Sequence, residues 1–176
     1  SAGVPEEYAN ETLVLPLNDV DALKKCVAEN AQNIACAIIE PIPANNGLLL
    51  QDKSFLLALR EICTENGILL FFDEVISGFR VAFGGATEIL GITPDLVTYG
   101  KIIGGGLPVG AYGAKKEIMA SVAPDGPVYQ AGTLSGNPVA MAAGIAQLTE
   151  CAKEGFYENQ QERTETFVGK INKHAS

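Results

Sequence analysis

The sequence has 176 residues, of which 47% are hydrophobic, and a chain of this length and composition can bury one sizeable core. Its formal net charge of −9 argues against a nucleic-acid partner, because binding a phosphate backbone requires a basic face. No apolar run reaches the length of a membrane span, and the N-terminal residues lack the basic-then-apolar pattern of a secretion signal, so no membrane partner is expected.

The first half of the chain alternates short apolar runs with helical periodicity. Pro16 interrupts the first apolar run, Asn18 is the expected N-cap of the helix that follows, and Gly67 is the expected C′ residue of the next helix. In chain order, the sequence predicts an irregular segment over residues 1–11, a strand over 12–17, a helix over 19–30, a strand over 33–40 that ends at Glu40, and a helix over 53–66.

The second half continues the alternation. Asn137 is the expected cap of its long helix, and Pro138 occupies the first helical position, where a missing N–H costs nothing. The predicted elements are strands over residues 68–75, 95–100 and 109–114, a less regular stretch between the first two strands, and helices over 137–154 and 157–174. This order predicts an α/β fold with a mostly parallel sheet and flanking helices.

The cysteines and the histidine do not form a metal-binding pattern. Cys26, Cys36, Cys63 and Cys151 lie far apart without C-x-x-C spacing, and His174 is the one histidine, so no metal site is expected. Cys36 and Cys63 lie in apolar stretches, which indicates buried, reduced thiols and a cytoplasmic protein.

Two charged residues stand at the carboxyl ends of predicted parallel strands, where open α/β sheets bind ligands. Asp73 follows the apolar run ILLFF, and a carboxylate there needs a cation or hydrogen-bond donors to stay ionised. Lys101 precedes the glycines of KIIGGG, whose lack of side chains leaves its amine room to reach a carbonyl, and partial burial would favour the nucleophilic free amine. A strand-end lysine with a strand-end aspartate suggests pyridoxal phosphate: the lysine forms the Schiff base and the aspartate pairs with the pyridine nitrogen.

Each of these residues also has a plainer interpretation when it is taken alone. Asp73 is then a turn cap, and Lys101 is a solvated surface lysine. Residues 104–106 form a tight turn rather than a phosphate cradle, because no G-x-x-x-x-G-K-[ST] pattern is present.

Three longer stretches resemble one family. LLFFDEVISGFRVAFGG, PDLVTYGKIIGGGLPVGAYG and YQAGTLSGNPVAMAAG are similar to the class III, fold type I PLP-dependent aminotransferases. Within that class, GFRVAFGG and VYQAGTLSGNP favour the glutamate-1-semialdehyde 2,1-aminomutases, since ordinary class III transaminases usually carry G-R-T-G after the D-E-V block.

The resemblance implies roles for individual residues. Lys101 would be the Schiff-base lysine and proton carrier, Asp73 would hold the pyridinium, and Val75 would pack on one face of the ring. Asn45, in EPIPANNG, resembles an asparagine near the cofactor's phenolic oxygen, although this context departs from the usual EPVAGNMG. Thr133, next to Gly132, resembles a residue that reaches the cofactor phosphate of a neighbouring subunit.

The same resemblance places Tyr129 at that subunit boundary, as a substrate or interface candidate. The plainer alternative is that residues 129–137 are an ordinary loop leading into a helix. The implied assembly is a homodimer with a shared active site.

The implied activity is conversion of glutamate-1-semialdehyde to 5-aminolevulinate for tetrapyrrole synthesis, with pyridoxal 5′-phosphate passing through its pyridoxamine form. Residues 1–156 would be the central part of the PLP-binding large domain, and residues 157–176 the start of a C-terminal small domain. No part of residues 1–33 matches the family's phosphate-gripping loop, so the isolated chain is expected to be inactive. The alternatives are a class III ω-amino acid transaminase and an inactive scaffold or dimerisation fragment.

Overall fold

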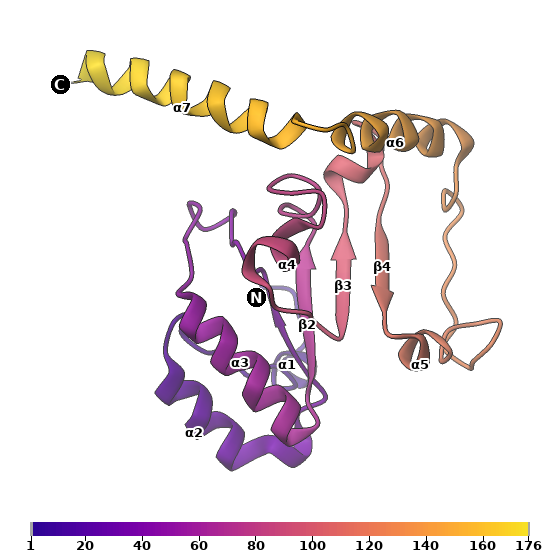
Figure 1. Ribbon diagram of the computed structural model, residues 1–176. Coiled ribbons are helices and arrows are strands. Elements are labelled where there is room, and N and C mark those ends of the chain that lie inside the picture. Colours follow the sequence, from indigo (N-terminus) through magenta and orange to yellow (C-terminus); the bar gives the residue numbers. More distant parts are fainter. Residues whose placement is uncertain (1, 176) are drawn as a thin grey trace.

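The computed structural model describes residues 2–175 and contains a four-stranded sheet with the strand order β1-β2-β3-β4 (Figure 1). The first three strands are parallel, and the fourth runs antiparallel to the third. The strands are β1 (Cys36–Ile39), β2 (Leu69–Glu74), β3 (Leu96–Tyr99) and β4 (Ala111–Ala114). The predicted α/β fold with a mostly parallel sheet and flanking helices is confirmed.

Helices flank this sheet, and the last of them extends away from it (Figure 1). The α-helices are α1 (Glu6–Ala9), α2 (Val20–Asn30), α3 (Lys53–Asn66), α4 (Gly85–Leu90), α5 (Lys116–Met119), α6 (Pro138–Cys151) and α7 (Phe156–Ala175). Two 3-10 turns, η1 (Ala31–Asn33) and η2 (Lys101–Gly104), precede β1 and follow β3. Among the described residues, no helix has both the length and the apolar character needed to cross a membrane.

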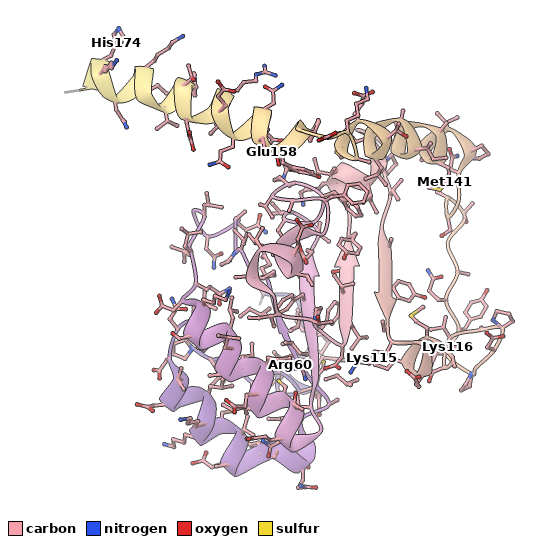
Figure 2. The ribbon with its side chains drawn as sticks, in the orientation of Figure 1. Arg60, Lys115, Lys116, Met141, Glu158 and His174 are labelled. Atoms are coloured by element: carbon pink, nitrogen blue, oxygen red, sulfur yellow. The ribbon has the colours of Figure 1, made fainter. Side chains whose placement is uncertain are left out.

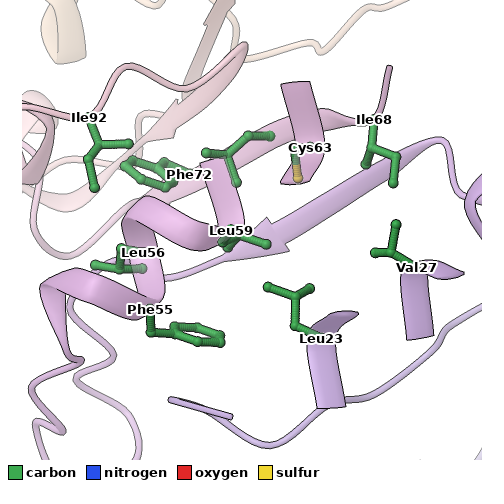
Figure 3. Packing of buried hydrophobic residues seen from close by; sticks show 10 residues of the cluster. Leu23, Val27, Phe55, Leu56, Leu59, Cys63, Ile68, Phe72 and Ile92 are labelled. Carbon is green, nitrogen blue, oxygen red and sulfur yellow. The ribbon is translucent and has the colours of Figure 1, made fainter. Parts of the chain in front are cut away.

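The core lies between β2 and the helices α2 and α3, as Figure 3 shows. Apolar side chains recur every three or four residues along both helices, so each helix turns one apolar face toward the sheet. Leu70 and Phe72 of β2 are completely buried beneath them. The cluster consists of Leu23, Val27, Phe55, Leu56, Leu59, Cys63, Ile68, Leu70, Phe72 and Ile92.

The helix ends follow local side-chain chemistry. The Asn137 side chain accepts hydrogen bonds from the backbone N–H of Val139 at 3.1 Å, which confirms the predicted cap of α6. Gly67 ends α3 with φ of 67°, also as predicted. The predicted cap of α2 is wrong by one residue: Asp19 accepts from the Ala22 N–H at 2.8 Å. Asn18 instead accepts from the N–H of Asp52 at 2.9 Å.

Two other sequence predictions are wrong. Residues 12–17 form no strand, because no described strand pairs with them, and Val14 is 86% exposed. Cys36 is exposed rather than buried, since it lies on the face of β1 opposite Ala37 and Ile39, which pack against the core. Cys63 is buried as expected, and burial raises the pKa of its thiol to about 11.

Candidate functional site

Asp73 and Lys101 lie at the same edge of the sheet, on neighbouring parallel strands. The register pairs Asp73 with Thr98 and Glu74 with Tyr99, so Lys101 follows β3 just beyond the end of this ladder. The carboxyl ends of parallel strands form the usual ligand-binding edge of an open α/β sheet. The sequence prediction that both residues lie at this edge is therefore met by the observed topology.

The two carboxylate oxygens of Asp73 differ in their hydrogen bonding to the described residues. Its Oδ1 accepts a hydrogen bond from the Val75 N–H at 3.0 Å and one from the Thr98 hydroxyl at 3.4 Å. Within residues 2–175, no hydrogen-bond donor contacts Oδ2. A half-buried carboxylate held in this way can accept a hydrogen bond from a cationic ring N–H.

Lys101 begins η2 in an unusual backbone conformation, with φ of 46°. A non-glycine residue in this left-handed region costs about 1–3 kcal/mol, and strained residues of this kind cluster at functional sites. The Lys101 side chain is exposed rather than partly buried. The described part of the chain supplies no ion-pair partner for the ammonium group, which leaves its amine available to a ligand.

Val75 joins the two strand ends. A Cβ atom built on Gly100 would lie 3.1 Å from Val75 Cγ1, so the Val75 side chain lies directly against the backbone that leads into Lys101. The structure thus brings together three of the predicted site residues, Asp73, Val75 and Lys101, through backbone contacts of two adjacent strands.

The glycines after Lys101 allow close packing of η2 on α6. Gly105 has φ of 57°, and a Cβ atom there would lie 2.5 Å from the carbonyl oxygen of Ala143. On the opposing helix, a Cβ atom at Gly144 would collide with the carbonyl oxygen of Ile103. The interpretation of residues 104–106 as a tight turn agrees with this packing, which the sequence alone did not predict.

Asn45 lies in the segment that follows the carboxyl end of β1. It is exposed, and its Nδ2 donates to Glu40 Oε1 at a long 3.5 Å. Because β1 is parallel to β2, this segment leaves the sheet at the same edge as Asp73. No hydrogen bond in the described residues joins Asn45 to Asp73 or Lys101.

The residues Tyr129, Gly132 and Thr133 are not brought to Lys101 within this chain. They lie in the connection between α5 and α6, which runs along the outer side of β4 (Figure 1). All three are exposed, and Tyr129 is 84% exposed. Their position leaves them accessible to another molecule, while the backbone leads into the capped start of α6.

Sequence reasoning missed the most extensive ionic contact of the fold. Asp95, only 6% exposed, binds Arg60 and Lys115 at 2.7 Å each and accepts from the Leu70 N–H at 2.8 Å; Figure 2 labels the two cations. Burial by itself raises the pKa of Asp95, but the hydrogen bonds from Lys115, the Leu70 N–H and Arg60 lower it to about 2. Because β4 pairs antiparallel with β3, residue 115 lies opposite residue 95, and predicting that pairing would have revealed the contact.

Glu74, the neighbour of Asp73 on β2, is a completely buried carboxylate. It accepts hydrogen bonds from Ser77, Ala86 and Thr87 on the side of β2 away from Asp73. Residues 2–175 contain no group of three or more potential metal ligands.

Comparison with known proteins identifies related sequences. Residues 3–176 match the family described as Aminotransferase class-III. A glutamate-1-semialdehyde 2,1-aminomutase of Geotalea daltonii is 54% identical over 164 residues, which cover 93% of this chain and 38% of that protein. A glutamate-1-semialdehyde 2,1-aminomutase of Desulfotalea psychrophila is 55% identical over 168 residues, covering 96% of this chain and 39% of that protein.

Solved structures show the same arrangement of elements. An omega-transaminase from Sphaerobacter thermophilus superposes with a TM-score of 0.79 and 41% identity, over 85% of this chain and 34% of that chain. A transaminase with PLP bound gives a TM-score of 0.79 at 36% identity, over 85% of this chain and 36% of that chain. The chain therefore spans less than two fifths of the length of each of these four proteins.

Proposed function

The chain belongs to the class-III aminotransferase family, and on that premise we propose that it is part of an enzyme that converts glutamate-1-semialdehyde to 5-aminolevulinate by intramolecular amino transfer. Relatives that bear this name are 54% and 55% identical to it. The observation that carries the proposal is the grouping of Asp73, Val75 and Lys101 at one edge of the sheet, with the left-handed Lys101 free of ion pairs in the described residues. The product would serve tetrapyrrole synthesis.

The residues at this edge fit pyridoxal 5′-phosphate, which alternates with its pyridoxamine form. When bound, this group supplies an electron sink for bond changes at the amino-bearing carbon. Asp73 Oδ2 would accept the hydrogen bond of the protonated ring nitrogen, and Val75 would cover one face of the ring. The Lys101 amine would bind the cofactor aldehyde and then carry protons between substrate carbons.

Borohydride reduction of the full-length protein tests the cofactor and the lysine together. We expect the intact mass to increase by one reduced pyridoxyl group and peptide mapping to place that group on Lys101. The Lys101→Ala variant should lose the increment, whereas Lys116→Ala, which changes an exposed lysine of α5, should keep it. A pyridoxyl group on another lysine would show that the proposed site is wrong.

The second candidate activity is that of a class III ω-amino acid transaminase. It is favoured by the likeness to the omega-transaminase from Sphaerobacter thermophilus, at 41% identity. The two activities differ in whether a second substrate is needed. Glutamate-1-semialdehyde supplied alone should be converted by a mutase, and a strict requirement for a keto acid acceptor would establish the transaminase.

We further propose a homodimer in which each active site takes Lys101 from one subunit and Thr133 from the other. The exposed connection that carries Tyr129, Gly132 and Thr133 supports this proposal, because its side chains are free to contact a second copy. Its hydroxyl and backbone N–H groups suit a cofactor phosphate. Asn45, in the segment that leaves β1 at the same edge of the sheet as Asp73, would approach the phenolic oxygen.

Mixing two variants with different defects tests the shared site, since Lys101→Ala should form no imine and Thr133→Ala should bind PLP more weakly. Heterodimers of Lys101→Ala with Thr133→Ala should contain one site with both defects and one site with neither. Tight PLP binding and reduction onto Lys101 should then return in part of the population. If mixing restores nothing, Thr133 acts within its own subunit or has no role in the site.

The proposal also includes domain limits and a cellular location. Residues 1–156 would belong to the PLP-binding large domain and residues 157–176 would begin the small domain, which accords with α7 extending away from the sheet (Figure 1). The free cysteines, Cys26, Cys36, Cys63 and Cys151, suit the reducing cytoplasm. The net charge of −9 disfavours nucleic acid, and no membrane partner is proposed.

A further inference from the structure

Glu74 is a completely buried carboxylate that pairs with no cation in the described residues. Its Oε2 accepts from the Ser77 hydroxyl at 3.0 Å and from the Ala86 N–H at 2.6 Å. Its Oε1 accepts from the Thr87 N–H at 3.1 Å and from the Thr87 hydroxyl at 2.9 Å. A buried charge is tolerated only where hydrogen bonds replace its lost hydration, and these four donors do so.

The donors of Glu74 come from both ends of one loop. Ser77 lies just after β2, whereas Ala86 and Thr87 lie in the first turn of α4, whose N–H groups have no partner within the helix. Glu74 therefore caps α4 from the end of β2 and closes residues 75–87 into a fixed loop. A Cβ atom at Gly85 would collide with Glu74 Oε2, so the absence of a side chain at Gly85 allows the α4 backbone to approach the carboxylate closely.

This loop carries strain that a fixed anchor must offset. Phe79 has φ of 56°, which is unfavourable for an aromatic residue. Gly78 has no room for a side chain, because a Cβ atom there would lie 2.5 Å from Tyr99 Cδ1. The Phe79 ring packs on Tyr99 with centroids 5.4 Å apart, so the loop lies against the strand that leads to Lys101.

The loop also determines where the candidate site residues lie. Val75 is its first residue: its N–H donates to Asp73 Oδ1, and its side chain lies against Gly100. Asp73 and Glu74 are neighbours on β2, so their side chains point to opposite faces. A shift of the loop would move Val75, and with it the hydrogen bond that orients the Asp73 carboxylate.

We propose that Glu74 is a positioning residue for the cofactor site: by anchoring residues 75–87 it holds Val75 and orients Asp73 toward the pyridine nitrogen without touching the cofactor. This inference rests on the proposed PLP site. It assigns to the second acidic residue of the D-E-V motif a role in cofactor affinity that is exerted through Asp73.

The test is Glu74→Gln in the full-length protein. A glutamine NH₂ group in this cage must face at least one buried N–H donor, that of Ala86 or Thr87, so the loop cannot keep its position. PLP is titrated into the apo protein, and the melting temperature of the apo protein is measured beside it. We expect the dissociation constant for PLP to rise about tenfold, which corresponds to about 1.4 kcal/mol.

The readout that separates positioning from a general loss of stability is coupling to Asp73. In an Asp73→Asn background, Glu74→Gln should change the PLP dissociation constant less than twofold, because the group it orients is already altered. Asp95→Asn is the matched control: it changes a buried carboxylate at the opposite edge of the sheet, and it should lower the melting temperature while leaving the PLP dissociation constant within twofold.

The milder variants Thr87→Val and Ser77→Ala each remove one side-chain donor to Glu74 and should raise the PLP dissociation constant two- to threefold. If Glu74→Gln does not fold, these two variants test the inference in its place. An unchanged dissociation constant in Glu74→Gln, or in both milder variants when that protein is unfolded, overturns the inference. A full tenfold effect in the Asp73→Asn background also overturns it. Either result leaves the proposed function intact as long as borohydride still labels Lys101 in the unsubstituted protein, whereas absence of that label refutes the proposed site itself.

Discussion

Asp95 connects three parts of the fold from one buried position, and replacing it by asparagine should weaken all three connections at once. Its carboxylate binds Arg60 of α3 and Lys115 beyond β4, and it accepts from the backbone N–H of Leu70 in β2. Asparagine keeps the size of the side chain but removes its charge. The variant therefore measures the electrostatic contribution rather than packing.

The magnitude follows from the pKa of Asp95. Burial works to raise it, but the bonds from Lys115, Leu70 and Arg60 lower it from an ordinary 3.8 to about 2. At about 1.36 kcal/mol per pH unit, this difference contributes about 2 kcal/mol to the free energy of unfolding. Because the pKa is lowered in the folded state, the contribution is fully present above about pH 4 and is lost as the pH falls through 2.

Hydrogen exchange of the full-length protein measures the contribution of the Asp95 contacts to local stability, on peptides that cover residues 68–75 and 95–99. At pH 7, Asp95→Asn should reduce the free energy of opening of these strands by about 2 kcal/mol. Lys115→Gln is the control and should cost less than about 1 kcal/mol, because the Lys115 side chain is 61% exposed and its ion pair is screened by water. Equal effects of the two substitutions, or no effect of Asp95→Asn, would refute the reasoning.

Asp73→Asn should lower the turnover number by roughly tenfold or more while the melting temperature changes little, because it removes a charge-assisted hydrogen bond to the ring nitrogen that is worth about 1.5–3 kcal/mol; near-normal turnover would show that another group protonates the ring. Tyr157→Phe should speed hydrogen exchange over residues 76–84 by about fivefold, since the Tyr157 hydroxyl donates to the Phe79 carbonyl at 2.9 Å and such a bond is worth about 1 kcal/mol. Unchanged exchange there would mean that α7 does not stabilise the loop.

Most helices and strands of the fold could be predicted from local sequence because their signals are local. The cap Asn137, the terminal Gly67 and the apolar run before Asp73 each determine an element within a few residues. Residues 12–17 have the composition of a strand but lack a described partner strand, and a strand depends on its partner. The burial of Cys36 was mispredicted for a related reason, since the buried face of a strand is decided by the helices that cover it.

In the candidate site, too, the features set by local sequence could be predicted and those set by distant contacts could not. Asp73 and Lys101 could be placed at one sheet edge because parallel strands bring their carboxyl ends together. The backbone of Lys101, with φ of 46°, could not be predicted, because no local signal requires a lysine to adopt a left-handed conformation. Nor could the Asp95 contacts, which depend on the antiparallel pairing of β3 with β4.

Two strained residues and the buried carboxylate of Glu74 lie around this site, and the contacts that hold the strain relate them. Phe79 and Lys101 each hold a left-handed backbone after adjacent strands, at a cost of about 1–3 kcal/mol per residue. Such conformations persist only where surrounding contacts fix them, and the bonds of Glu74 supply such contacts to the loop that contains Phe79. For Lys101 the close packing of Gly105 against the Ala143 carbonyl serves the same purpose. Substitutions that relax either set of contacts should therefore reduce both the backbone strain and the affinity for the cofactor. Substitutions in the exposed connection around Thr133 differ, because no residue there has a strained backbone to relax.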